Sequence, residues 1–252
     1  MVDTVITRLR QAGCVFAEDE ARLLTEAART PAELDDLVHR RIAGLPLEHL
    51  LGWAEFHGHR ITVDPGVFVP RRRTEFLVDQ ATALGGRVVL DLCCGSGAVG
   101  VALAAALRET ELYAADIDPA AVRCARRNVE PAGGAVFEGD LFTPLPAHLR
   151  GRVDLLVVNA PYVPTDAIAM MPPEARDHEP RVALDGGDDG VDVHRRVTAA
   201  AADWLAPGGH LLIETGEAQA PVTAAAFTAG GLDPRIAHND DIGGTVVVGA
   251  LR

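Results

Sequence analysis

The sequence predicts an α/β fold, in which helices cover both faces of a doubly wound, mostly parallel sheet. The first observation is that short apolar runs alternate with helical segments from about residue 87 onward. The second is a glycine turn, at Gly95 and Gly97, between an apolar run ending at Asp91 and a helical segment rich in Ala, Leu and Val. The third is that polar residues follow several of the apolar runs. Strands that alternate with helices pair in parallel, because each crossover helix returns the chain to the same edge of the sheet.

Residues 1–51 are predicted to form a small, separate helical domain. The segment Thr30 to Glu33 has the pattern of a capping box, with proline at the first helical position and apolar residues recurring on one face beyond it. Such a domain fits two roles: a packing appendage or a module that recognises a partner.

Residues 52–70 are predicted to be a β-hairpin linker, because two short extended runs, residues 54–57 and 60–63, flank Gly58. The linker also holds two histidines, but no thiol or carboxylate accompanies them in a metal-binding pattern, and a surface pair is favoured. Three arginines follow at residues 71–73 and fit a solvated basic turn. Thr74 is expected to N-cap the next helix.

Residues 71–252 are predicted to form the α/β domain. After the glycine turn, helices are expected over residues 118–128, 189–204 and 217–229. Strands are expected over residues 88–91, 112–116, 135–137, 154–158, 209–215 and 245–250.

Four polar residues follow strands of this domain: Asp91, Asp116, Asp140 and Asn159. Ligands of doubly wound sheets bind beyond the carboxyl ends of the strands, so these side chains are expected to meet at one site. Asp116 lies about 20 residues beyond the glycine turn, the spacing at which a carboxylate accepts ribose hydroxyl protons. The turn also matches G-x-G-x-x-G, with Gly100 third, and this match fits NAD as well as S-adenosylmethionine.

Composition excludes several classes of protein. The chain has 252 residues, of which 48% are hydrophobic and 23% charged, and this is enough apolar material to form a full hydrophobic core. The net charge of −13 argues against stable binding to nucleic acid. All 23 basic residues are arginine, which excludes lysine Schiff bases and P-loops. No signal peptide and no membrane-spanning run is evident, so a cytoplasmic protein with free thiols is expected.

The segment Asn159-Ala160-Pro161-Tyr162 resembles a signature of a known enzyme class. Together with the nucleotide unit upstream, it resembles class I S-adenosylmethionine-dependent methyltransferases that modify planar amino groups, whose signature is Asn-Pro-Pro-Tyr. The chain is most similar to the protein glutamine-N5 methyltransferase family, which includes the peptide chain release factor methyltransferases. The resemblance begins near Arg41 and rests on residues 44–63, 69–78, 91–104, 115–122, 139–142, 159–164 and 178–190.

This resemblance implies a seven-stranded Rossmann-like sheet, S-adenosylmethionine as cofactor, no metal, and a protein substrate such as a release factor or ribosomal protein. The residues it assigns to the cofactor are Asp91, Cys93, Cys94, Gly95, Ser96, Gly97, Asp116, Asp140, Leu141 and Asn159. Those it assigns to catalysis and the acceptor amide are Asn159, Ala160, Pro161 and Tyr162, and Glu179 is a further substrate-binding candidate. The assignment suits the chemistry, because an amide nitrogen is a poor nucleophile that needs acceptors on its N–H groups and alignment with the methyl group.

The chain departs from the family pattern at three places. Cys93 stands where the family has its first turn glycine, Ala160 replaces the first proline of the signature, and Arg72-Arg73 replaces Pro-Glu/Asp in the arginine motif. Two alternatives stay open at this stage. One is a nucleic-acid amino methyltransferase acting on adenine N6 or guanine N2. The other is an NAD-dependent dehydrogenase, which leaves the segment from Asn159 to Tyr162 without a role.

Overall fold

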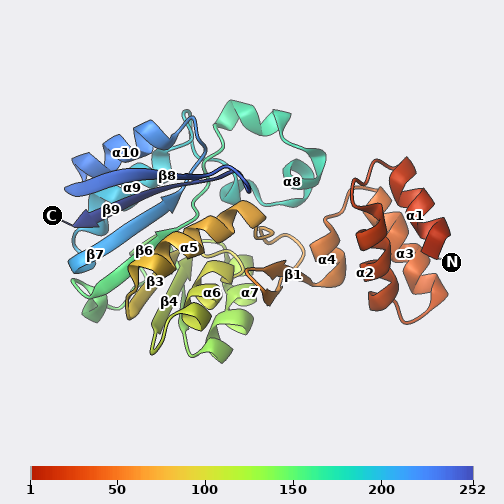
Figure 1. Cartoon of the computed structure of the whole chain (residues 1–252), viewed down its shortest axis with the longest axis horizontal. Coiled ribbons are helices and arrows are strands. Elements are labelled where there is room, and N and C mark those ends of the chain that lie inside the picture. The colour runs from red at the N-terminus through yellow and green to blue at the C-terminus, as the bar shows by residue number, and fades with distance from the viewer. Residues whose placement is uncertain (1, 252) are drawn as a thin grey trace.

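The computed structural model describes residues 2–251, and its N-terminal helices lie at the opposite end of the molecule from the C-terminus (Figure 1). Their apolar side chains form a cluster of their own around Leu9, Leu24 and Val38. The hydroxyl of Thr30 accepts a hydrogen bond from the Glu33 amide, as the capping pattern predicts. The helices are α1 (Val2–Gln11), α2 (Ala17–Ala27), α3 (Pro31–Ile42) and α4 (Leu47–Leu51).

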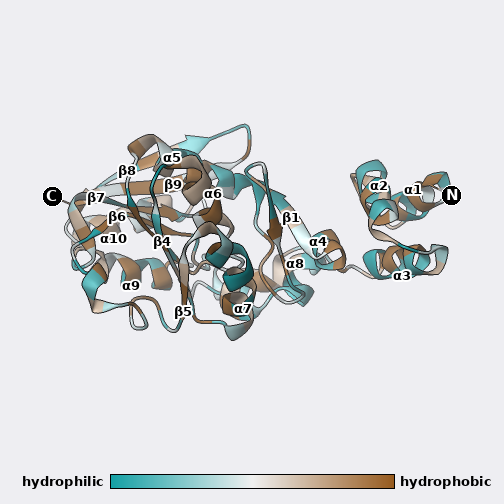
Figure 2. Ribbon diagram, turned by 90° about the horizontal axis from the view of Figure 1, so that it is seen from below, coloured by the Kyte–Doolittle hydropathy of each residue, from teal (hydrophilic) through white to brown (hydrophobic). Residues whose placement is uncertain are grey.

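A two-stranded hairpin follows the helices, as predicted, and lies between them and the main sheet (Figure 2). It consists of β1 (Trp53–Phe56) and β2 (His59–Thr62), which are antiparallel. Asn128 ties the hairpin to the α/β part, because its carboxamide accepts from the amide of Thr62 at 3.0 Å and donates to the Thr62 carbonyl at 2.9 Å.

The main sheet has seven strands within residues 2–251, in the order β5-β4-β3-β6-β7-β9-β8, which confirms the predicted fold class. The five strands from β5 to β7 are parallel, whereas β9 is antiparallel to both β7 and β8. The strands are β3 (Val88–Leu92), β4 (Glu111–Asp116), β5 (Ala135–Glu138), β6 (Val153–Val158), β7 (Leu205–Glu214), β8 (Leu232–Asn239) and β9 (Gly244–Leu251).

Helices cover both faces of this sheet (Figure 1). Successive strand residues point to opposite faces, so Val89 belongs to one core cluster and Leu90 to the other. The first cluster is covered by α5 (Glu75–Leu84), α6 (Ala98–Ala106) and α7 (Pro119–Val129). The second is covered by α9 (Asp192–Ala201) and α10 (Ala220–Ala229), while the short α8 (Pro173–His178) lies toward the N-terminal helices.

The structure differs from the prediction at the C-terminal edge. No strand is predicted over residues 232–239, yet β8 forms the edge of the sheet there. Its side chains are mostly exposed or half-exposed, and it carries Pro234, which an edge strand tolerates because one side of its backbone forms no ladder. Burial on both faces, which makes the central strands β3 and β6 apolar, is absent here.

Thr74 occupies the predicted N-cap position of α5, but its side chain does not cap the helix. It ends a 3-10 turn, Arg72–Thr74, with helical backbone angles, and its side chain makes no capping hydrogen bond to the helix. Its buried hydroxyl instead accepts a hydrogen bond from Asn159. No helix in residues 2–251 is long and apolar enough to cross a membrane.

Candidate active site

The predicted strand-end residues surround one cavity. Asp91, Asp116, Asp140 and Asn159 all line it, because β5, β4, β3 and β6 are neighbours in the sheet and end at the same edge. The pairing of Asp91 with Ala114 in β4 and with Val157 in β6 places Asp91 in the middle of that edge. The cavity therefore lies where doubly wound sheets bind ligands.

The glycine turn after β3 forms one wall. Gly95 has a φ of +54°, and the space beside it is open, so a ligand can approach its backbone closely. Cys93 also takes a left-handed conformation, with a φ of +56°, although it carries a side chain. Cysteine thus stands here in a backbone conformation that glycine adopts more readily.

Two turn glycines serve packing. Gly97 does not line the cavity, and a Cβ atom there would lie 2.6 Å from the side chain of Val129 in α7. Gly100, in α6, donates a 2.9 Å hydrogen bond to Oδ2 of Asp91, an approach that a larger residue would obstruct. The resemblance assigns Gly97 to the cofactor, and in the structure this glycine lies at the contact between α6 and α7, behind the cavity lining.

Asp116 is held by backbone amides through both oxygens. Its Oδ2 accepts from Gly95 at 2.8 Å, and its Oδ1 accepts from Asp118 at 2.9 Å. Burial raises the pKa of Asp116, and these two amides act in the opposite direction. Each carboxylate oxygen keeps a second lone pair for a ligand hydroxyl.

Asp91 is almost fully buried at the base of the cavity. Burial, and to a smaller extent the nearby charge of Asp116, raise its pKa to about 7 against the opposing effect of the hydrogen bond from Gly100. A cationic ligand group beside Asp91 would reverse this rise, because it favours the charged carboxylate. Asp91 thus provides a carboxylate at the floor of the cavity that can bind a positively charged ligand group.

Apolar side chains and one ion pair border the far end of the cavity. Ile117, Leu141 and Val193 are the apolar groups, and Leu141 has a left-handed φ of +47°. Asp140 is bonded to Arg196 at 2.6 Å, so its charge is balanced within the wall. A flat heterocycle with polar edges fits such a border.

The segment after β6 forms the opposite wall. Asn159, Ala160, Pro161 and Tyr162 all line the cavity, and Ala160 is buried to 2% exposure. The carboxamide nitrogen of Asn159 donates a 3.3 Å hydrogen bond to the Thr74 hydroxyl. Thr74 in the cavity wall thereby engages the nitrogen, and the carboxamide oxygen remains as an acceptor.

Tyr162 is anchored by a buried carboxylate at the end of β7. Its hydroxyl donates to Oε1 of Glu214 at 3.2 Å, and Arg73 Nε lies 3.4 Å from the same oxygen. The Arg73 guanidinium also lies 5.9 Å from the centre of the Tyr162 ring. Burial raises the pKa of the Tyr162 hydroxyl, and the Glu214 charge adds to the rise, so the hydroxyl stays protonated.

Glu179 is not in the cavity wall. Its Oε1 accepts from the Val69 amide at 3.2 Å and from Arg71 at 2.5 Å, and Arg71 in turn lies over the ring of Phe68. Arg71 and Phe68 line the cavity, whereas Glu179 lies behind them. The three arginines were expected to form a solvated turn. Instead, Arg71 and Arg73 line the cavity, and each forms an ion pair with a buried glutamate.

Three side chains of the acceptor wall, Phe68, Arg73 and Thr74, and the buried Glu214 behind it were not predicted as site residues. Arg73 and Thr74 belong to the arginine motif, which was expected to form a basic turn and a helix cap, and Phe68 lies just before it. Glu214 had no local signal, because a glutamate at the end of a strand is common and its partners come from distant parts of the chain.

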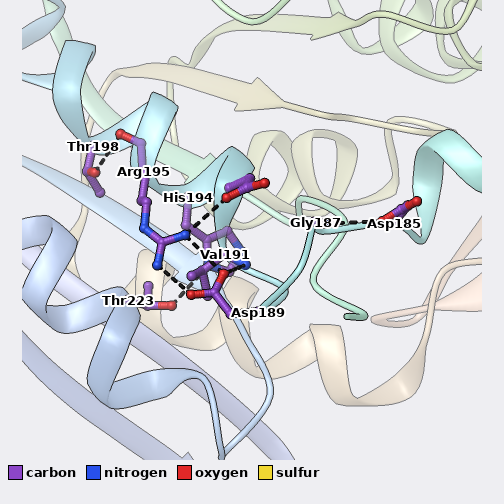
Figure 3. A network of polar contacts seen from close by, with 9 residues as sticks. Asp185, Gly187, Asp189, Val191, His194, Arg195, Thr198 and Thr223 are labelled. Atoms are coloured by element: carbon purple, nitrogen blue, oxygen red, sulfur yellow. Dashed lines mark hydrogen bonds and ion pairs between the residues drawn. The ribbon is translucent and has the colours of Figure 1, made fainter. Parts of the chain in front are cut away.

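The acidic segment after α8 is accounted for by local pairing. Figure 3 shows Asp189 joined to Arg195, with bonds of 2.5 and 2.9 Å, and Asp185 joined to the amide of Gly187. Asp185 also accepts from the Thr165 hydroxyl at 2.6 Å. Across the described residues, no group of three or more His, Cys, Asp or Glu side chains is arranged to hold a metal ion.

The fold and this site define a class I S-adenosylmethionine-dependent methyltransferase. Residues 58–171 match the family model "Methyltransferase small domain". A methyltransferase structure from Pyrococcus furiosus aligns with a TM-score of 0.57 at 16% identity, covering 75% of this chain and 88% of that one. A ribosomal protein L11 methylase structure from Lactobacillus delbrueckii subsp. bulgaricus aligns with a TM-score of 0.51 at 13% identity, covering 72% and 78%. At these identities the two structures show the fold alone.

The chain belongs to the release factor glutamine methyltransferase family. It is 41% identical to the Geobacter sulfurreducens release factor glutamine methyltransferase over 84% of this chain and 75% of that one. It is 39% identical to the Deinococcus radiodurans relative of the same name, over 89% and 87%. A Streptomyces pristinaespiralis protein named 4-amino-L-phenylalanine/4-methylamino-L-phenylalanine methyltransferase is 36% identical, over 81% and 73%. Membership of this family rules out the dehydrogenase alternative.

The residues present fit S-adenosylmethionine, the cofactor of this class. Asp116 offers free lone pairs for two ribose hydroxyls, and Asp91 offers a carboxylate for the cationic methionine end. The left-handed turn at Gly95 lets the ligand lie against the backbone. The apolar border at Ile117 and Leu141 suits adenine.

Proposed function

We propose that this chain transfers a methyl group from S-adenosylmethionine to the side-chain amide nitrogen, N5, of a glutamine in a release factor. The observation that carries the proposal is the orientation of Asn159. Its carboxamide nitrogen is bonded to Thr74, so its oxygen is available to accept from the N–H groups of an incoming amide. The backbone carbonyl of Ala160 is the second acceptor.

The proposed roles divide the cavity into two halves. The cofactor half is formed by Asp91, the turn from Cys93 to Ser96, Asp116, and the pair Asp140 and Leu141. The acceptor half is formed by the residues from Asn159 to Tyr162, with Asn159 between the two halves. When bound, the cofactor supplies a methyl group on a positively charged sulfur.

The chain's own residues then act by alignment. The substrate nitrogen has a lone pair delocalised into its carbonyl, so Asn159 and the Ala160 carbonyl hold both N–H groups and direct the nitrogen toward the methyl carbon. Tyr162 packs against the plane of the amide. The new nitrogen–carbon bond forms as the sulfur–carbon bond breaks, and the nitrogen then releases one proton to solvent. No general base is required before transfer.

The N-terminal part serves the partner protein in this proposal. Helices α1 to α4 form their own apolar cluster and lie beside the acceptor side of the molecule, where Arg41 of α3 is paired with Glu174 of α8 at 3.3 Å. We infer that residues 1–51 are a recognition domain and that the reaction takes place in the cytoplasm, where release factors act. The net charge of −13 favours a partner with a basic surface.

A second candidate acceptor is the amino group of a free aromatic amino acid. The Streptomyces relative supports it, since its name describes methylation of an arylamine. Arg73 also supports it, because this guanidinium lines the acceptor half, where the family pattern has an acidic residue. A substrate carboxylate would share Arg73 with Glu214, the ion-pair partner of this guanidinium.

The test uses tritium-labelled S-adenosylmethionine with three acceptors: a purified bacterial release factor, 4-amino-L-phenylalanine and total RNA. Asn159→Ala serves as the control variant. Label that enters the release factor and maps to one glutamine supports the proposal. Label only in the amino acid supports the second candidate, and label only in RNA would reject both.

A further inference from the structure

Glu214 is the most deeply buried charged group near the site, and the proposed chemistry leaves it without a role. It is 1% exposed, and its Oε2 atom has no hydrogen-bond partner among the residues that the structure describes. The parallel pairing of Val158 with Ile213 explains its position. Asn159 and Glu214 are the next residues of two neighbouring strands, so the carboxylate lies directly behind the acceptor wall.

Two side chains of the acceptor half contact this carboxylate directly, and a third, Thr74, lies close to it. Tyr162 donates to Oε1 at 3.2 Å, and Arg73 forms an ion pair with the same oxygen. Burial raises the pKa of Glu214, and the strongest opposing influence is the Thr74 hydroxyl beside it. Thr74 follows Arg73 in the chain and accepts a hydrogen bond from the Asn159 carboxamide, and Asn159 and Glu214 end neighbouring strands. The Glu214 carboxylate therefore contacts Tyr162 and lies next to the partner of Asn159.

The direction of these hydrogen bonds follows from the chemistry of the groups. An ionised carboxylate only accepts, so it attracts the hydroxyl proton of Thr74. The Thr74 oxygen then has only lone pairs to offer Asn159, which must turn its NH₂ group toward it. The Asn159 oxygen consequently faces the cavity. Without the carboxylate, Thr74 is free to donate to that oxygen, and the reversed Asn159 would present N–H groups to a substrate that also carries N–H groups.

We propose that Glu214 is a positioning residue for methyl transfer, which acts through Thr74 to set the orientation of the Asn159 carboxamide and directly to hold Tyr162. This inference rests on the proposed function, since it concerns the acceptor wall of the same site. Arg73 completes the arrangement by balancing the charge of the buried carboxylate. Glu214 itself does not touch the substrate.

The kinetic test uses matched substitutions at Thr74. Thr74→Val keeps the shape and removes the hydroxyl, whereas Thr74→Ser keeps the hydroxyl. We expect Thr74→Val to lower kcat by about 10- to 100-fold with little change in the Kd for S-adenosylmethionine, and Thr74→Ser to recover most of kcat. Thr82→Val, in the helix α5 that follows Thr74 and outside the cavity, is the control and should leave kcat unchanged. Equal activity of Thr74→Val and Thr74→Ser would overturn the inference.

A second variant tests the carboxylate. Glu214→Gln should lower kcat to a similar degree, and the double variant Glu214→Gln/Thr74→Val should be no slower than the slower single variant, because both changes break one chain of contacts. Losses that multiply would show that the two residues act independently and would reject the proposed relay. Thermal melts of each variant separate these effects from loss of folding.

A measurement that needs no activity separates this inference from the proposed function. The chain has three asparagines, Asn128, Asn159 and Asn239, so the side-chain ¹⁵N resonance of Asn159 is assigned by its loss in Asn159→Ala. We expect its NH₂ protons to exchange slowly in the wild type and faster in both Thr74→Val and Glu214→Gln. If the release factor is not a substrate but this pattern holds, only the proposed function fails; unchanged exchange in both variants overturns the relay.

Discussion

The amide of Gly95 donates a 2.8 Å hydrogen bond to Oδ2 of Asp116, 21 residues further along the chain. The bond joins the glycine turn after β3 to the end of β4, so the residue expected to bind the ribose also holds the turn expected to bind the methionine end. The part of the site expected to bind the ribose is thus hydrogen-bonded to the part expected to bind the methionine end. Loss of Asp116 should affect both.

We therefore predict that Asp116→Ala weakens binding of S-adenosylmethionine by roughly 1 to 3 kcal/mol, the cost of leaving buried polar groups unpaired. Isothermal titration calorimetry of the two proteins measures the change. Asp116→Asn retains one acceptor oxygen and should lose less affinity than Asp116→Ala. Equal affinity of wild type and Asp116→Ala would remove Asp116 from the cofactor site.

Asn159→Ala should abolish methyl transfer while cofactor binding stays detectable. The reason is that this substitution removes the carboxamide oxygen from the acceptor half, whereas Asp91, Asp116 and the turn at Gly95 remain. Single-turnover transfer and calorimetric binding are measured on the same preparation. Turnover at the wild-type rate would show that the acceptor amide binds elsewhere.

Much of the fold could be predicted because most strands of the sheet are covered on both faces. Val89 and Leu90 face opposite clusters and are both fully buried, so β3 is a continuous apolar run that stands out in the sequence. Strand β8 has no such signal, since it is a half-exposed edge strand containing Pro234. A strand is recognised in the sequence by the apolar residues that its burial requires, and β8 has few of them because it is little buried.

The sequence predicted those residues of the candidate site that follow strands or belong to a recognisable motif. Asp91, Asp116, Asp140 and Asn159 share the cavity, because parallel strands end at one edge. Thr74 lies before the helix as the capping pattern predicts, but only the folded chain shows that its hydroxyl accepts from Asn159 and does not cap the helix. Contacts between residues 85 positions apart have no local signature.

Cys93 has a left-handed backbone, with a φ of +56°, where the family has glycine. An L-residue pays about 1 kcal/mol or more in that region, and glycine does not. We predict that Cys93→Gly is more stable than Cys93→Ala by about 1 kcal/mol, since both remove the sulfur and only glycine removes the strain. Urea unfolding at equal protein concentration measures the difference. The idea fails if alanine is as stable as glycine.

We predict that the free energy of unfolding falls in mild acid because of His194. It is fully buried in α9, its Nδ1 lies 2.9 Å from the Thr223 hydroxyl of α10, and its Nε2 has no partner among the described side chains (Figure 3). Burial lowers its pKa from 6.5 to about 4. The native state therefore binds fewer protons than the unfolded state between these values, and stability falls as the pH drops from 6.5 toward 4.

The full effect of His194 is about 3 kcal/mol by proton linkage. Free energies of unfolding between pH 4.5 and 7 should fall more steeply for the wild type than for His194→Gln, which cannot take up a proton. Parallel slopes for the two proteins would assign the acid sensitivity to other groups.

Cofactor binding should depend on pH through Asp91. Burial raises the pKa of this carboxyl to about 7 in the free protein. A cationic methionine end binds the ionised form, so the Kd for S-adenosylmethionine should rise as the pH falls below 7, by up to about tenfold per pH unit. Calorimetry from pH 5.5 to 7.5 measures this slope, with Asp91→Asn as the comparison. Because asparagine does not titrate, its Kd should be weaker and nearly constant; a wild-type Kd independent of pH would place the ammonium group away from Asp91.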